Sequence, residues 1–173
     1  MKLQQIDKAV YRKRSTQLMI MTVVILLATS LSVSNILIAL FGSEVNGENF
    51  WLNAAGVIAG LFVISLVYKV ILAKPYMAEV NYVRNLKKEM NRIYRNSKML
   101  QAKTEEGNKQ ALIISYYNFQ LCKQIYQLDN NTLTMDELNE KIRALDQRLE
   151  EMGLEITADD YTPELLDELK SVT

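Results

Sequence analysis

The stretch that decides the fold runs from Leu18 to Leu40 and reads LMIMTVVILLATSLSVSNILIAL, 23 residues without a charge. A helix needs about 20 mainly apolar residues to cross the hydrocarbon core of a bilayer. A chain of 173 residues is too short to surround such a helix with a soluble core on all sides. A cleaved signal peptide does not fit either, since its apolar region spans only about 7–15 residues. The pattern therefore predicts a transmembrane helix over about 18–41.

A second apolar stretch begins at Trp51 and reads WLNAAGVIAGLFVISLVYKVILA, with 18 uncharged residues before Lys69. It predicts a second transmembrane helix over about 51–73, joined to the first by an outer loop at 42–50. Lys69 lies near the end of this span, where its long stem lets the ammonium group reach the interface. The alternative is a residue of an ion pathway. Trp51 and Tyr68 fit the aromatic belts of the two interfaces.

Basic residues flank the two spans on one side only. They are Lys2, Lys8, Arg12, Lys13 and Arg14 in the basic segment 1–14, and Lys74, Arg84, Lys87 and Lys88 after the second span. Because cytoplasmic flanks are enriched in Lys and Arg, both termini are expected in the cytoplasm. The cations expected to contact the anionic headgroups of the lipid bilayer are Lys69, Lys74, Arg84, Lys87 and Lys88.

Small residues mark where the two spans are able to touch. Gly56 and Gly60 form a GxxxG spacing, with Ala55 and Ala59 beside them. Helix backbones approach closely on such faces, so we expect these four residues to form a helix-packing contact. The contact lies either between the two spans of one chain or between copies in a homo-oligomer.

Residues 76–173 predict a cytoplasmic helical domain that is either a bundle or coiled-coil-like. Its predicted helices cover about 76–105, 108–128 and 134–152, and a short last helix starts at Pro163. Thr134 and Glu137 match a capping box at the start of the third helix. The predicted fold class is therefore all-α: a two-helix transmembrane hairpin over 15–75, followed by this domain.

The two halves of the chain carry opposite charge. Residues 1–110 hold 15 Lys and Arg against 7 Asp and Glu, whereas residues 111–173 hold 5 against 13. The first predicted helix of the domain is basic and either lies on headgroups, contacts nucleic acid or forms the outer face of a bundle. No nucleic-acid-binding motif accompanies it, so we expect no nucleic acid partner. We expect its later cations, Arg92, Arg95 and Lys98, to face the acidic distal helices.

The composition restricts the available chemistry. The chain has no histidine and a single cysteine, Cys122, so the commonest general base and metal ligand are missing. It contains no phosphate-binding, dinucleotide-binding, nucleophile-elbow or CxxC motif. We therefore expect no enzyme, no cofactor and no catalytic or metal-binding residues. The tyrosines near Tyr117 are better explained by core packing than by a stacking platform, and the acidic residues near Asp160 by a solvated surface than by a cation site.

The basic N-terminus, the two spans, the KPY turn at Lys74 to Tyr76 and the long helical tail together resemble an uncharacterised family of proteins. Its members are two-span inner-membrane proteins of Gram-negative bacteria. The resemblance covers the whole chain and implies the bacterial inner membrane, but no activity and no site residues.

Two functions remain open from the sequence. The first is a non-catalytic, membrane-anchored interaction, scaffold or assembly protein at the inner face of the membrane, which binds a protein partner or forms a homo-oligomer. The alternative is an oligomeric channel or a small transporter subunit, suggested by the GxxxG spacing, the hydroxyl-rich first span and Lys69. The sequence names neither the biological process nor the partner.

Overall fold

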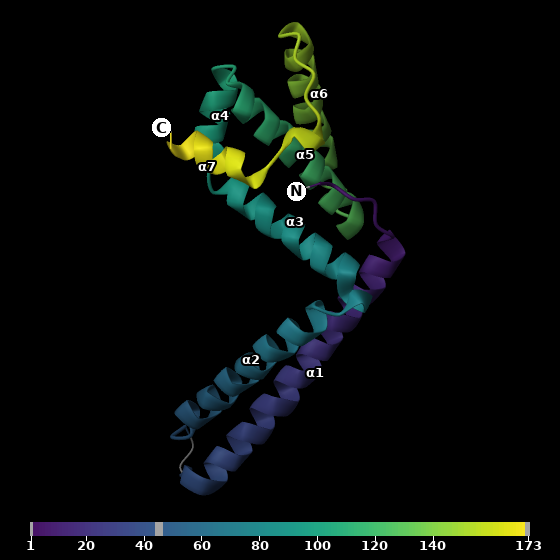
Figure 1. The fold of residues 1–173 in the computed structure, drawn as a ribbon. Helices are drawn as coiled ribbons and strands as arrows, with labels where there is room; N and C mark the ends of the chain where they lie inside the picture. Colours follow the sequence, from purple (N-terminus) through teal and green to yellow (C-terminus); the bar gives the residue numbers. More distant parts are fainter. Residues whose placement is uncertain (1, 44–46, 172–173) are drawn as a thin grey trace. The chain divides into compact units, whose positions relative to one another are not determined.

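The structure is a computed structural model that describes residues 2–43 and 47–171, and every regular element within these ranges is helical (Figure 1). The elements are α1 (Lys8–Phe41), α2 (Phe50–Leu72), η1 (Pro75–Met77), α3 (Ala78–Tyr94), α4 (Ser97–Glu105), α5 (Lys109–Asp129), α6 (Met135–Glu151), η2 (Ala158–Asp160) and α7 (Pro163–Ser171). The all-α fold class expected from the sequence is confirmed.

The chain divides into two compact units. One unit, Ala9–Asn81, contains α1 and α2, which we call the apolar helix pair. The other unit combines Met1–Lys8 with Tyr82–Thr173, and we call it the helical unit.

The apolar helix pair consists of two antiparallel helices that lie side by side (Figure 1). Both are long and apolar enough to cross a membrane. Only 6% of the most apolar window of α1 and 17% of that of α2 are buried. A core helix of a soluble protein is mostly buried, so this exposure separates α1 and α2 from such helices.

The basic segment after α2 forms two helices instead of the single helix over 76–105 that the sequence predicts. α3 ends at Tyr94 and α4 begins at Ser97. Asn96 makes the break, because its side-chain amide donates to the carbonyl oxygen of Arg92 over 2.8 Å and its backbone, with φ −112°, leaves the helical region. An asparagine side chain competes in this way for carbonyl groups at a helix end.

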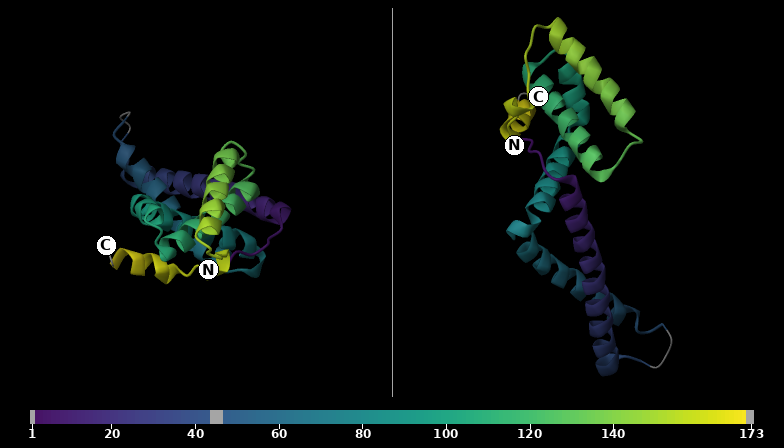
Figure 2. Two further views of the ribbon diagram at one scale, coloured as in Figure 1. Left: turned by 90° about the horizontal axis from the view of Figure 1, so that it is seen from above. Right: turned by 90° about the vertical axis from the view of Figure 1, so that its right-hand side faces the viewer.

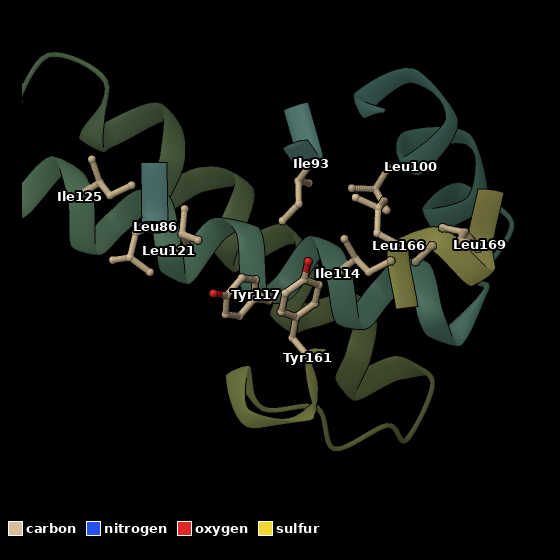
Figure 3. Packing of buried hydrophobic residues seen from close by; sticks show 11 residues of the cluster. Leu86, Ile93, Leu100, Ile114, Tyr117, Leu121, Ile125, Tyr161, Leu166 and Leu169 are labelled. Carbon is tan, nitrogen blue, oxygen red and sulfur yellow. The ribbon is translucent and has the colours of Figure 1, made fainter. Parts of the chain in front are cut away.

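α5 is the central helix of the helical unit. It contacts α4, α6, η2 and α7, and Figure 2 shows it between α6 and α7. Asn108 caps its start by accepting a hydrogen bond of 3.1 Å from the backbone N–H of Ala111. Asn130 ends it in the left-handed conformation, with φ 57°. The buried cluster around α5 includes Leu86, Ile93, Leu100, Ile114, Tyr117, Leu121, Ile125, Tyr161, Leu166 and Leu169 (Figure 3).

α6 packs on α5 through the apolar stripe that the sequence shows. Leu138, Ile142, Leu145 and Leu149 are buried, so α6 is a bundle helix in this chain. The predicted capping box at Thr134 is wrong, since the Thr134 side chain makes no cap hydrogen bond.

The carboxylate that the predicted box requires is engaged elsewhere. Glu137 accepts a hydrogen bond of 2.6 Å from Lys141, one turn further along α6. A capping box forms instead at η2, where Thr157 and Asp160 bond reciprocally.

Candidate functional site

The close contact of the apolar helix pair is formed around Gly56 of α2. A Cβ atom at Gly56 would overlap the hydroxyl of Ser34 and would lie 2.6 Å from the carbonyl oxygen of Ser30, which belongs to the α1 backbone. At Gly60 the nearest atoms are Cδ1 of Leu26 at 3.0 Å and the Leu26 carbonyl oxygen at 3.4 Å. The tightest approach is therefore at Gly56.

The alanines of the predicted contact are half-buried beside these glycines. Ala55 and Ala59 are both partly covered within the described chain, whereas the neighbouring Val57 and Ile58 are exposed. Gly56 and Gly60 therefore face α1 within one chain, and packing by Ala55 and Ala59 stays a prediction.

Three hydroxyl groups of the apolar helix pair form hydrogen bonds within the pair. The hydroxyls of Thr22 and Tyr68 lie 2.9 Å apart, and Thr22 also donates to the carbonyl oxygen of Leu18 over 2.7 Å. Ser34 donates to the carbonyl oxygen of Asn53 over 3.4 Å. Thr22 and Ser34 are thus turned inward, whereas Ser32 and Ser65 are exposed. Large apolar side chains are exposed as well, among them Leu31, Leu40, Phe50, Ile58 and Phe62.

A polar cluster lies at the end of the pair opposite the loop that joins α1 to α2. Arg14 forms an ion pair with Glu79, and its guanidinium carbon lies 4.4 Å from the centroid of the Tyr76 ring. Tyr76 donates a hydrogen bond of 2.7 Å to Oε1 of Gln17. The KPY turn therefore uses its tyrosine to fix the segment after α2 against the start of α1.

The five predicted headgroup cations differ in their surroundings. Lys87 is half-buried, and its Nζ lies 2.6 Å from Asp129 of α5. The other four are exposed: Lys69, Lys74, Arg84 and Lys88. Contact with lipid headgroups stays a prediction for all five.

The N-terminal segment contributes to the helical unit, which the sequence did not suggest. The backbone N–H of Gln4 donates to the hydroxyl of Tyr82 over 2.7 Å, and Gln124 donates to the Gln4 carbonyl oxygen over 2.6 Å. Leu3 packs against the cluster around α5. The apolar residues Leu3 and Ile6, within an otherwise polar segment, were the available signal.

A polar network joins α3 to Tyr161 and α7, with Glu89 and Arg92 half-buried and Asp167 exposed. Tyr161, which follows η2, donates a hydrogen bond to Glu89, and burial raises the pKa of Tyr161 above its ordinary value. Arg92 pairs with Glu89 at 3.1 Å and with Asp167 at 2.7 Å, and it donates to the Pro163 carbonyl oxygen over 2.7 Å. The hydrogen bond from Arg92 lowers the pKa of Asp167.

This network tests the expectation that three cations face the acidic distal helices. Arg92 does so through Asp167 of α7, which confirms the expectation for that residue. Arg95 and Lys98 are exposed and form no ion pair with a described residue.

The helical unit also contains a cavity of about 530 Å³ between the α3–α4 corner, α5 and α6. Its apolar lining includes Ile93, Leu100, Phe119 and Leu145. Ser115 and other polar groups share the wall, and cations of α6 stand at the edge. Sequence reasoning missed this site, because it forms only when four successive helices pack against one another.

Within residues 2–43 and 47–171, no group of three or more Cys, Asp or Glu side chains is arranged to hold a metal ion. Cys122 is half-buried, and burial raises the pKa of its thiol to about 11. The thiolate is the reactive form of cysteine, so this side chain reacts slowly at neutral pH.

The chain matches the model of a family described as "Protein of unknown function (DUF3087)" over residues 1–166. It belongs to this family. Membership of DUF3087 confirms that the chain is of an uncharacterised family, as the resemblance implied, and that the match covers nearly the whole chain. No curated protein and no solved structure matches it. The DUF3087 description assigns no activity, so a function has to be argued from the geometry.

Proposed function

We propose that this chain is a non-catalytic, membrane-anchored interaction protein, in which α1 and α2 cross the bilayer as a hairpin and the helical unit binds a partner. One observation carries the proposal. The apolar helix pair exposes its large apolar side chains and buries Gly56, Gly60, Ser30 and Ser34. In water this distribution is unfavourable by about 25 cal/mol for each Å² of exposed apolar surface, whereas in lipid it is the stable one.

The distribution of charged residues supports a membrane orientation with both termini on the same side. The polar cluster around Arg14 and Tyr76 and the exposed Lys74 all belong to the end of the pair that continues into α3. Because Lys and Arg are enriched on the cytoplasmic side, we place both termini in the cytoplasm of a bacterium and the protein in its inner membrane.

The surface of α6 supports the proposal that the helical unit binds a partner. Its side away from α5 carries exposed carboxylates, among them Asp136, Glu140, Asp146 and Glu150. These acidic groups favour a basic partner or the basic half of a second copy, since complementary charge guides and orients association.

The channel alternative has less support. Some of the hydroxyls that suggested a hydrophilic path bond within the helix pair, as Thr22 does with Tyr68 and Ser34 with the Asn53 carbonyl oxygen. Lys69 is exposed on α2 and is not directed at this contact.

Site-specific photo-crosslinking of the full chain in membranes tests the interaction. A crosslinking amino acid at Asp146 samples the acidic face, and one at Ala102, an exposed residue of α4, is the matched control. We expect a discrete product of defined mass from position 146 and none from position 102. A chain that is monomeric by light scattering in mild detergent and gives no product at 146 contradicts the proposal.

A further inference from the structure

The cavity of the helical unit has the size of a small-molecule site. Its volume is about 530 Å³, and ligand pockets in proteins occupy about 300–1,000 Å³. Ile93 of α3, Leu100 of α4 and Leu145 of α6 are buried and form its apolar wall. Tyr94 stands at the edge and is 73% exposed, although tyrosine rings are usually at least partly covered. An apolar body fits against this wall.

Two hydroxyls in the cavity wall bond to each other, and one hydroxyl hydrogen stays available as a donor. The oxygens of Thr104 and Ser115 lie 2.9 Å apart, and Ser115 is only 7% exposed. Each hydroxyl carries one hydrogen, so one of the two donates to the other and the second hydrogen is left for a further acceptor. A ligand oxygen in the cavity can accept it.

Cations stand on the α6 side of the cavity. Lys141 and Arg148 flank the small, exposed Ala144, and seven residues of helix separate their Cα atoms by about 10 Å. Arg148 uses one N–H on the carbonyl oxygen of Glu105, over 2.6 Å, and retains further donors. Lys141 pairs with Glu137 in an exposed contact, which holds it only weakly.

The side chain of Glu105 is the one carboxylate in the lining, and Gln101 donates to it over 3.0 Å. The other polar groups of the lining are two cations, the amides of Gln101 and Asn118, and the hydroxyls of Tyr94, Ser97, Thr104 and Ser115. A cavity with two cations, one carboxylate and an apolar wall favours a molecule with negative charge at one end and an apolar body at the other.

We propose that this cavity binds a small amphipathic anion, with its apolar body against Ile93, Leu100 and Leu145 and its anionic group between Lys141 and Arg148. The ligand is either a free solute or an anionic lipid, since both present the same chemistry. The site lies within the helical unit alone, so it does not depend on whether α1 and α2 cross a membrane.

Fluorine NMR with 8,8,8-trifluorooctanoate tests the site on the full chain in phosphatidylcholine nanodiscs. Ala144→Phe fills the cavity, and Lys141→Gln with Arg148→Gln removes its cations. Ala102→Phe and Arg143→Gln are the matched controls, because both residues are exposed and lie outside the lining. Empty nanodiscs report partition of the probe into lipid.

We expect saturable one-to-one binding to the wild type that weakens about tenfold or more in both cavity variants and stays within about twofold in both controls. Release of the probe by phosphatidylglycerol nanodiscs identifies a lipid ligand, and release only by added octanoate identifies a free solute. The proposal is overturned if binding does not saturate, if trifluorooctanol binds as tightly as the carboxylate, or if the cavity variants bind like the wild type.

Discussion

The phenol rings of Tyr117 and Tyr161 are stacked in the core of the helical unit, with their centroids 3.9 Å apart and their planes 12° from parallel (Figure 3). Their hydroxyls differ. Tyr161 donates to Glu89, whereas the Tyr117 hydroxyl is buried without a partner among the described residues. The stack joins α5 to the segment between η2 and α7, so the two rings hold the C-terminal part of the chain on the central helix.

Removing the two hydroxyls should have opposite effects on stability. Tyr161→Phe removes one of the two donors to Glu89, which keeps its pair with Arg92, and should lower the free energy of unfolding by about 1–3 kcal/mol. Tyr117→Phe removes an unsatisfied hydroxyl and should leave stability unchanged or raise it by up to about 1 kcal/mol. Urea denaturation of the detergent-solubilised chain, followed by circular dichroism, measures both. Equal losses in the two variants would show that the hydroxyls do not differ as described.

Alkaline pH should destabilise the helical unit through the same pair. Burial raises the pKa of both Tyr117 and Tyr161 above the ordinary value of about 10. The contribution of these two tyrosines to the free energy of unfolding is present in full at pH values below this ordinary pKa. Above it the unfolded tyrosines lose protons while the folded ones keep theirs, so stability falls with rising pH. The urea midpoint between pH 8 and 11 should fall more steeply for the wild type than for Tyr117→Phe/Tyr161→Phe, and parallel curves would contradict this.

Arg92 should hold α7 on the helical unit. Replacing it with glutamine removes the ion pair with Asp167 and the bond to the Pro163 carbonyl oxygen, both at 2.7 Å. We expect amide hydrogen exchange in α7 to become about tenfold faster, which corresponds to about 1.4 kcal/mol. Arg95→Gln is the control, because Arg95 is exposed and has no ionic partner among the described residues. The same increase in both variants would mean that general loss of positive charge, not this contact, loosens α7.

Gly56 should tolerate a methyl group less well than Gly60. At Gly56 the added Cβ lies 2.6 Å from the Ser30 carbonyl oxygen, which is backbone and unable to rotate away, whereas at Gly60 the nearest atom ends the flexible Leu26 side chain. Electron spin resonance between labels at Leu31→Cys and Ile58→Cys measures the separation of α1 and α2. Gly56→Ala should increase it by about 1–2 Å, within the usual range of helix spacings, and Gly60→Ala should change it less. A larger shift for Gly60→Ala would place the tight contact elsewhere.

The local patterns of the chain predicted most of the helices. Uncharged runs predicted the apolar parts of α1 and α2, although α1 begins at Lys8, before the predicted span. The spacing of three and four residues from Leu138 to Leu149 indicated the buried face of α6, since it depends on neighbouring residues alone. The break at Asn96 was missed because apolar residues at helical spacing, Val83, Leu86, Met90, Ile93 and Leu100, lie on both sides of it. The helix ends there because the Asn96 side-chain amide bonds to the Arg92 carbonyl oxygen. The capping box was placed at Thr134 because the motif fits there, but Glu137 bonds to Lys141 instead.

The contacts between distant segments were not predictable in the same way. Tyr161 and Glu89 are 72 residues apart, and Gln4 and Gln124 are 120 apart, so no periodicity links them. The cavity combines residues from α3, α4, α5 and α6, each of which reads as an ordinary helix surface on its own. GxxxG was recognised as a packing motif, and only the structure shows that its partner is the Ser30–Ser34 segment of the same chain.

Cysteine labelling in intact cells tests the transmembrane hairpin most directly. In a Cys122→Ala background, Glu48→Cys introduces a thiol in the loop between α1 and α2, and Glu151→Cys introduces one at the end of α6; both positions are exposed. A membrane-impermeant maleimide is applied to spheroplasts before and after lysis. We predict that Glu48→Cys is labelled before lysis and Glu151→Cys only after it. Labelling of Glu48→Cys only after lysis, or of both positions before it, would contradict the membrane-anchored hairpin.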